Sequence, residues 1–171
     1  MLNYALQELE QGRINKIIIV GNNSQTADSR ELAALPGGVL EKELVYLAGV
    51  IDIMGTYAIE EKVYKGQLEI IPMATIRGRN LENSIIYVNE AQNLTESHIK
   101  LLLGRVAEGS RIFFDGDAKQ TDSYKFKEKN GLKLLAKVHE ELDSNIISYT
   151  KLKQIERSDV ARLADKIDEL F

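Results

Sequence analysis

Polar side chains that could act on a phosphate or on water follow an apolar run in the middle of this sequence. Asn89 and Glu90 come directly after Ile85–Val88, and Glu90 is a carboxylate that could polarise an attacking water. The amide of Asn89 can accept a hydrogen bond from metal-bound water, but it brings no charge. The same segment can be read as a polar strand end with a helix cap at Asn93, and the residues alone leave both interpretations open.

A second polar group follows the apolar run Arg111–Phe114. It contains Asp117 and Gln120 in a Gly-Asp-x-x-Gln element. Beside a nucleotide, such an element lets the Gln sense the terminal phosphate. Asp and Gly are also ordinary turn residues, so a tight turn is the stronger interpretation of this segment taken alone.

Three arginines are further candidates. Arg77 and Arg79 flank a glycine just before the carboxylate segment, and the guanidinium group suits phosphate recognition. Arg157 stands where a strand-to-helix loop is expected, a reasonable place for an arginine finger. Exposed arginines are common, and Arg157 could equally pair with Glu156 or Asp159 at the surface.

The elements that must position these residues are alternating strands and helices. Continuous β-branched runs predict strands buried on both faces, as in parallel sheets. We expect strands at Ile17–Val20, Leu68–Pro72, Ile85–Val88, Arg111–Phe114 and Ile146–Leu152.

Helical spacing of apolar residues predicts the intervening helices. They lie at residues 2–11 with a stop at Gly12, and at 44–54, 59–65, 99–106 and 132–142, with a last one capped by Ser158. The alternation indicates a mainly parallel, three-layer α/β domain. In such a sheet Asn89–Glu90, Asp117 and Arg157 should lie near one edge, outside the carboxyl ends of the strands.

Composition restricts the function classes. The 171 residues suffice for one domain, and 44% hydrophobic and 28% charged residues are typical of a soluble globular protein, which we expect in the cytoplasm and not in a membrane. The absence of cysteine and the presence of two histidines exclude disulfides, thiol catalysis and a His-rich metal site. With a net charge of −4, contact with nucleic acid requires a local basic patch, for which Arg77, Arg79, Lys125, Lys127 and Lys129 are the candidates.

Taken together and in this order, the motifs resemble the PhoH-like ATPases, a P-loop family related to superfamily-one helicases. The stretch TIRGRNLENSIIYVNEAQNLTESHIKLLLGRVAEGSRIFFDGDAKQTD looks like the central block of the family. GLKLLAKVHEELDSNIISYTKLKQIERSDVARLADKI looks like its C-terminal block, closest to the branch that carries a PIN nuclease domain. The resemblance covers nearly the whole chain and implies one P-loop NTPase-like domain over residues 1–171.

The resemblance also implies a site and partners. Glu90, Gln120 and Arg157 would be catalytic, while Asn89, Asp117, Arg77 and Arg79 would surround ATP and Mg²⁺, with Asn89 a weak metal ligand. Family members are described as hexameric rings with roles in RNA unwinding or decay. A homo-oligomer and RNA are therefore the expected partners.

Two departures from the family pattern concern the phosphates. The acidic pair Asp-Glu is here Asn89-Glu90, and no G-x-x-x-x-G-K occurs in the 171 residues. We therefore expect a domain truncated at its N-terminus, without the phosphate-loop strand, and impaired in ATP binding. That strand would lie between Arg111–Phe114 and Ile146–Leu152, so without it these two strands close up or another segment fills the gap. The alternative function is an inactive PhoH-like module that assembles with or regulates an intact partner.

Overall fold

The computed structural model describes residues 1–21, 48–118, 120–121, 124–142 and 145–152. The chain divides into two compact units, Met1–Lys137 and Val138–Phe171, and the sheet belongs to the first. The expected loop after Gly21, the start of the expected helix at residues 44–54, Arg157 and the helix expected after Ser158 lie outside the described residues.

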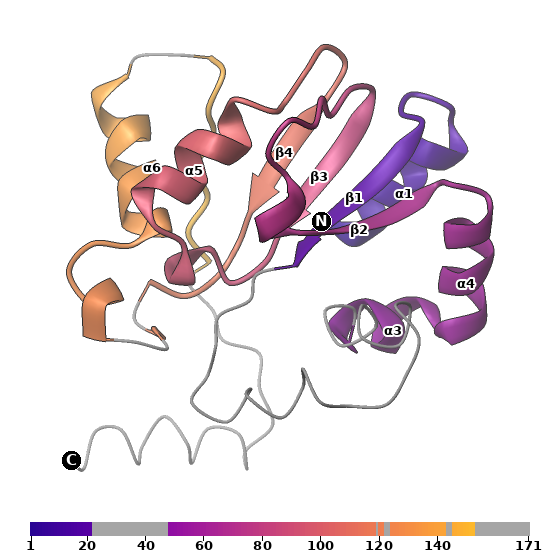
Figure 1. Cartoon of the computed structure of the whole chain (residues 1–171), viewed down its shortest axis with the longest axis horizontal. Helices are drawn as coiled ribbons and strands as arrows, with labels where there is room; N and C mark the ends of the chain where they lie inside the picture. The colour runs from indigo at the N-terminus through magenta and orange to yellow at the C-terminus, as the bar shows by residue number, and fades with distance from the viewer. Residues whose placement is uncertain (22–47, 119, 122–123, 143–144, 153–171) are drawn as a thin grey trace. The chain divides into compact units, whose positions relative to one another are not determined.

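Four parallel strands form the sheet in the order β2-β1-β3-β4 (Figure 1). Ile17 of the central β1 pairs with Leu68 of β2 and with Ile85 of β3, and Ile85 pairs in turn with Arg111 of β4. The predicted α/β class with a parallel sheet is confirmed. The strands are β1 Lys16–Gly21, β2 Leu68–Pro72, β3 Ser84–Val88 and β4 Arg111–Phe114.

One face of the sheet carries a hydrophobic cluster. Alternate strand residues such as Ile17, Ile19 and Ile85 meet apolar side chains from three helices. These helices are α1 Leu2–Glu10, α3 Ala48–Met54 and α4 Thr56–Tyr64. Gly12 follows α1 with φ of 67°, in the left-handed conformation that favours glycine, and so ends this helix where the sequence predicts.

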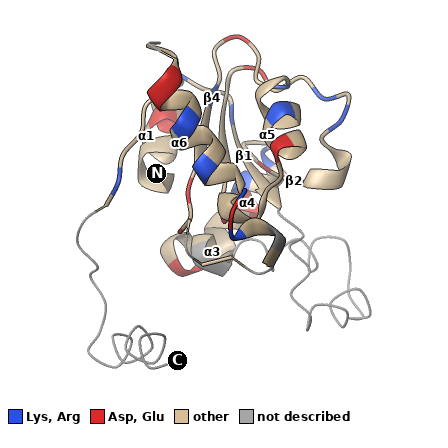
Figure 2. Ribbon diagram, turned by 90° about the vertical axis from the view of Figure 1, so that its left-hand side faces the viewer, with Lys and Arg blue, Asp and Glu red and all other residues tan. Residues whose placement is uncertain are grey.

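The opposite face buries Ile18, Val20, Ile86 and Val88, and α5, Glu96–Leu103, lies on that side of the sheet, away from α1 (Figure 2). Burial on both faces explains why the central strands β1 and β3 are continuous apolar runs in the sequence. The remaining elements are α6 Gly131–Glu141 and the short 3-10 helices η3 Met73–Thr75, η4 Ala91–Asn93 and η5 Tyr124–Phe126.

Three details of the sequence interpretation are wrong. The cap of α5 is Thr95, whose side chain accepts from the His98 backbone N–H at 3.3 Å, because Asn93 is taken up in η4. Helical spacing predicts Leu103 on the same inward face as Ile99 and Leu102, but it is 45% exposed at the last turn of α5. The expected strand Ile146–Leu152 has no regular secondary structure.

The physical reason for the last correction is the exposure of its apolar side chains. Ile146 is 96% and Leu152 85% exposed, so this segment buries too little surface to hold a strand. Among the residues that the structure places, β4 pairs with β3 alone, so the two strands expected to flank a gap do not pair with each other.

Strand order reverses at the centre of the sheet. The chain moves from β1 to β2 on one side and then crosses to β3 on the other side of β1. In open parallel sheets, ligands bind outside the carboxyl ends of the strands at such a reversal, which lies here between β1 and β3. In the described part of the chain, no helix is long and apolar enough to cross a membrane.

Candidate functional site at the carboxyl edge of the sheet

The turn that leaves β3 has an unusual backbone. Glu90 adopts φ of 55° and ψ of 42°, a left-handed conformation that side chains other than glycine rarely take. Asn89 and Glu90 are both exposed, while the Ala91–Asn93 helix that follows is buried. A strained residue held in place by buried neighbours is a recurrent feature of functional sites.

The residue after β4, Asp115, forms a backbone hydrogen bond on each side of this turn. The backbone N–H of Asp115 donates to the Val88 carbonyl at 3.1 Å, and the Asp115 carbonyl accepts from the Ala91 N–H at 2.8 Å. Asn89 and Glu90 are thus held between two hydrogen bonds to a single residue, Asp115, which directly follows β4.

The Asp115 side chain is partly buried and contacts β3 through Tyr87. Its Oδ2 accepts a hydrogen bond from the Tyr87 hydroxyl at 2.6 Å, while its buried Oδ1 has no partner among the described groups. Burial raises the pKa of Asp115, an effect that the Tyr87 hydrogen bond opposes and the charge of Glu90 reinforces. Burial and the Asp115 carboxylate together raise the pKa of Tyr87.

Gln92 connects the turn to the loop after β4. Its side chain is 1% exposed, and its Nε2 donates both to the Glu90 carboxylate and to the Gln120 carbonyl, the latter at 2.8 Å. The Gln120 N–H donates to the carbonyl of Asp117 at 3.1 Å, and the side chain of Asp117 is exposed. The structure therefore brings Glu90, Gln120 and Asp117 to one edge of the sheet.

The start of α6 supports the same loop. Asn130 is 4% exposed, and its Nδ2 donates to the carbonyls of Phe126 at 3.0 Å and Ala118 at 3.4 Å. Its Oδ1 caps the helix by accepting from the Lys133 N–H at 2.9 Å. One buried amide thus ties the loop after β4 to the segment before α6.

The beginning of α1 is directed to this edge too. The amino group of Met1 lies close enough to Asp115 to favour its ionised form, and seven residues later Glu8 reaches the start of β4 through Arg111. The helix therefore runs opposite to the strand, with its amino end beside the polar turns. Free N–H groups at a helix amino end attract anions.

The arginines of the sequence pattern do not all join this edge. Arg79 donates to Glu69 at 2.6 Å, and Lys16 donates to the same carboxylate at 2.8 Å. Since Lys16 and Glu69 lie at the beginnings of β1 and β2, Arg79 occupies the amino edge of the sheet, opposite Glu90. Arg77 is exposed on the connection between β2 and β3.

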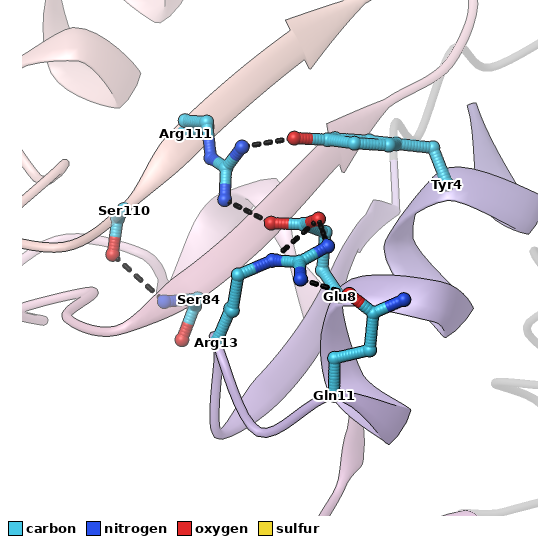
Figure 3. A network of polar contacts seen from close by, with 7 residues as sticks. All are labelled: Tyr4, Glu8, Gln11, Arg13, Ser84, Ser110 and Arg111. Carbon is cyan, nitrogen blue, oxygen red and sulfur yellow. Dashed lines mark hydrogen bonds and ion pairs between the residues drawn. The ribbon is translucent and has the colours of Figure 1, made fainter.

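A second ion-pair network also lies at the amino edge (Figure 3). The buried Glu8 accepts from Arg13 at 2.9 Å through Nε and from Arg111 at 2.6 Å. These two guanidinium groups, Arg13 first, lower the pKa of Glu8 to about 2. Arg111 also donates to the Tyr4 hydroxyl, whose ring packs edge-on against Phe113.

The donor set limits which metal could bind. Within the described ranges, no three His, Cys, Asp or Glu side chains are grouped as ligands for an ion. Mg²⁺ usually keeps several waters and takes one or two carboxylates plus substrate phosphates, so it does not need such a cage. Asn89 and Glu90 fit a water-mediated Mg²⁺ site of this type, with phosphate supplying the remaining oxygens.

Sequence reasoning missed three residues of this edge. Gln92 stood within the quoted NEAQN segment and Asp115 within FDGD, but neither was singled out because amides and carboxylates in turns are common. The available signal was Gln92 itself, a polar residue inside a segment that had to be buried between a strand and a helix. Tyr87 carried no signal apart from its place in an apolar run.

An all-parallel α/β sheet with carboxylate and amide groups at the carboxyl ends of neighbouring strands is consistent with a P-loop NTPase-like domain. The chain belongs to the PhoH-like family, since the family model "PhoH-like protein" matches residues 1–169. Membership of this family implies nucleotide binding.

Curated relatives carry the same family name. A "PhoH-like protein" of Bacillus subtilis (strain 168) is 34% identical over 173 residues, which cover 98% of this chain and 52% of the relative. "Protein PhoH2" of Mycolicibacterium smegmatis is 28% identical over 169 residues, 96% of this chain and 38% of the relative. "Protein PhoH" of Escherichia coli (strain K12) is 34% identical over 113 residues, 61% of this chain and 31% of the relative. The chain thus spans about half or less of the length of these relatives.

Proposed function

We propose that this PhoH-like domain binds ATP with Mg²⁺ at the carboxyl edge of its sheet and that the family chemistry, ATP hydrolysis coupled to RNA, takes place there. The supporting observation is that Gln92 joins Glu90, after β3, to the Gln120 loop, after β4, next to the reversal of strand order between β1 and β3. Two groups predicted separately from the sequence are thereby held together. Residues 1–171 would act as one ATPase domain of three layers, related to the PIN-fused branch.

Each candidate residue has a distinct role in this proposal. Glu90 orients and polarises the attacking water, and Gln120 contacts the terminal phosphate. Asn89 would hold Mg²⁺ through a bound water, and Asp117 would lie beside the nucleotide. When bound, Mg²⁺ neutralises charge on the phosphates. Arg157 would act as an arginine finger towards a neighbouring subunit.

The two arginines before β3 are assigned to phosphate only through the family resemblance. Arg77 is exposed and could turn towards a ligand, whereas Arg79 would first have to leave Glu69. Of the two, Arg77 is therefore the stronger candidate for contact with ATP.

We further propose that the 171-residue polypeptide binds ATP weakly. Its sequence contains no G-x-x-x-x-G-K, and Asn89 replaces an acidic residue next to the metal. Hydrogen bonds to charged groups contribute about 1.5–3 kcal/mol each, so the loss of several reduces affinity by orders of magnitude.

An NMR titration with Mg·ATP tests both statements. We expect millimolar affinity, with amide shifts concentrated at residues 89–92 and 115–120. Glu90→Gln should alter the shifts, whereas the matched change Glu96→Gln on the exposed start of α5 should leave them unchanged. Low-micromolar affinity would contradict weak binding. Shifts confined to other regions at saturating ATP would contradict the site.

An RNA contact is favoured by one specific observation. The ring of Tyr124 is 82% exposed, and the Lys127 ammonium lies over it at 5.5 Å from the centroid. Exposed aromatic rings among lysines are a common platform for single-stranded nucleic acid. Lys129 and Lys125 extend the basic sequence, while Arg79 lies at the other edge of the sheet.

Fluorescence anisotropy with a single-stranded RNA measures this contact. Affinity should fall steeply between 50 mM and 200 mM salt, and Tyr124→Ala should weaken binding several-fold. Tyr64→Ala provides the control, because Tyr64 is 93% exposed on α4. Equal effects of the two substitutions would argue against a role for the loop.

The alternative function is an inactive PhoH-like module that assembles with or regulates an intact partner. We also expect the chain to associate with itself. Light scattering over a concentration series tests self-association and, with it, the finger role of Arg157. We expect a mass that grows with concentration. A constant monomer mass up to high micromolar concentrations would leave Arg157 without a neighbouring site.

A further inference from the structure

The Gln92 side chain has a fixed orientation. A primary amide has two N–H donors, and Gln92 directs them at acceptors from two different loops, the Glu90 carboxylate and the Gln120 carbonyl. The reverse orientation would place Oε1 against two oxygens. Only one rotamer of the amide therefore satisfies both loops at once.

The loop after β4 leaves a closely fitting space for this amide. A Cβ atom built on Gly116 would lie 2.0 Å from Gln92 Oε1 and 3.2 Å from the Ala91 nitrogen. The Asp115 backbone adds hydrogen bonds to Val88 and Ala91. The Glu90 turn and the loop at 115–120 are thus joined through backbone and side chain, with Gln92 enclosed between them.

We propose that Gln92 is a positioning residue that makes the Glu90 turn and the Gln120 loop behave as one body. The inference rests on the proposed function, in which Gln120 meets the terminal phosphate and Glu90 holds the attacking water. Contact of a phosphate with the loop then fixes the Glu90 carboxylate through the Gln92 amide. Backbone hydrogen bonds place the turn, and the Gln92 amide adds a contact to the carboxylate itself.

Hydrogen exchange tests the connection without nucleotide. In Gln92→Met, which keeps the volume but removes both donors, the amides of Asn93 and Gln120 should exchange at least tenfold faster. The Ile18 amide in β1 should stay within twofold of wild type, which shows that the fold is intact. Gln67→Met, the same change at the other edge, should alter neither site. Unchanged exchange at Asn93 and Gln120 in Gln92→Met would overturn the proposal.

A measurement on the unmodified chain covers the case in which Gln92→Met does not fold. Both side-chain amide protons of Gln92 should exchange much more slowly than those of Gln67. Equally fast exchange of the two side chains would overturn the proposal as well.

A Mg·ATP titration then distinguishes failure of the Gln92 coupling from failure of the proposed ATP site. In wild type, ATP should shift the amides of both Glu90 and Gln120, whereas in Gln92→Met the shift at Glu90 should fall at least threefold and the shift at Gln120 should persist. Equal shifts at Glu90 in the two proteins would overturn the coupling. If ATP shifts neither amide in wild type, the proposed function fails, and the exchange data still decide whether Gln92 joins the loops.

Discussion

Carboxylates at the two edges of the sheet have opposite electrostatic surroundings. At the amino edge, Glu8 meets two guanidinium groups, and Glu69 meets one guanidinium and one ammonium group. Each of these two carboxylates has two positive neighbours. The pKa of Glu8 is accordingly lowered to about 2 by its hydrogen bonds to Arg13 and Arg111.

At the carboxyl edge the Asp115 carboxylate has a neutral tyrosine as its hydrogen-bond partner and the negative Glu90 nearby. Its pKa is raised, and the buried Oδ1 has no partner in the described part of the molecule. At the amino edge, the ion pairs of the carboxylates stabilise the fold. At the carboxyl edge, the negative charge of Asp115 does not contribute to stability. Local features that oppose stability are typical of functional sites.

The largest effect should come from filling the space beside Gln92. Gly116→Ala puts a methyl group against a buried amide at φ of 147°, and should destabilise the protein by about 2–3 kcal/mol. Urea denaturation measures the change. Gly66→Ala is the matched control at the other edge, since it has positive φ but nothing within 4 Å, and should cost about 1 kcal/mol. Equal costs would show that the Gln92 space is not tightly packed.

The second effect concerns the amino edge. The pKa of Glu8 is lower in the folded protein than its ordinary value of 4.5, so its ionised form contributes stability at neutral pH that is lost as pH falls towards about 2. Glu8→Gln should therefore lower the urea midpoint at pH 7, and the gap to wild type should shrink between pH 5 and pH 2.5. Glu10→Gln, on the exposed side of the same helix, is the control. A gap that does not change with pH would refute the ionic explanation.

The third effect is smaller and opposite in sign. Because the pKa of Asp115 is raised in the folded protein, its ionisation costs stability as pH rises. Asp115→Asn keeps the shape and can still accept from Tyr87. Relative to wild type, its urea midpoint should rise between pH 4 and pH 7. A midpoint that falls over this range would mean that a cation such as the Met1 amino group compensates the Asp115 charge.

The smallest effect should come from an exposed ion pair on α4. Lys65 and Glu61 form an i,i+4 pair at 2.5 Å on α4, with about half of each side chain exposed (53% and 48%). Exposed pairs of this type contribute little. Lys65→Met should leave the urea midpoint within measurement error. A loss of stability comparable to that of Glu8→Gln would show that an exposed ion pair contributes as much as the ion pairs of the buried Glu8.

The strands could be predicted from sequence because their signals are local. The expected limits of Leu68–Pro72 and Arg111–Phe114 agree with β2 and β4. The apolar runs Ile17–Val20 and Ile85–Val88 fall within β1 and β3, and these two strands are buried on both faces. The same logic failed at Ile146–Leu152. A strand also requires a neighbouring strand, and sequence pattern does not report whether a neighbour is present.

The site could be predicted only in part. Glu90 and Asp117 were recognised because they follow buried strands, and strand ends of a parallel sheet share an edge. Gln92 and Asp115 were missed because their importance lies in contacts across two loops. Arg79 was assigned to phosphate by its position in a motif, while the structure pairs it with Glu69. Side-chain partners of this kind depend on tertiary placement.

The position of β1 in the sheet has a consequence for synthesis of the chain. Both of its neighbours, β2 and β3, follow it in the sequence by about fifty residues or more. At a synthesis rate of about 5–20 residues per second, the apolar run Ile17–Val20 waits for seconds before either partner leaves the ribosome. During this interval it is an unpaired, aggregation-prone apolar segment of the nascent chain. Helix α1, which precedes it and packs on the same hydrophobic cluster, is the nearest cover available, so α1 would shield β1 from aggregation before the sheet exists.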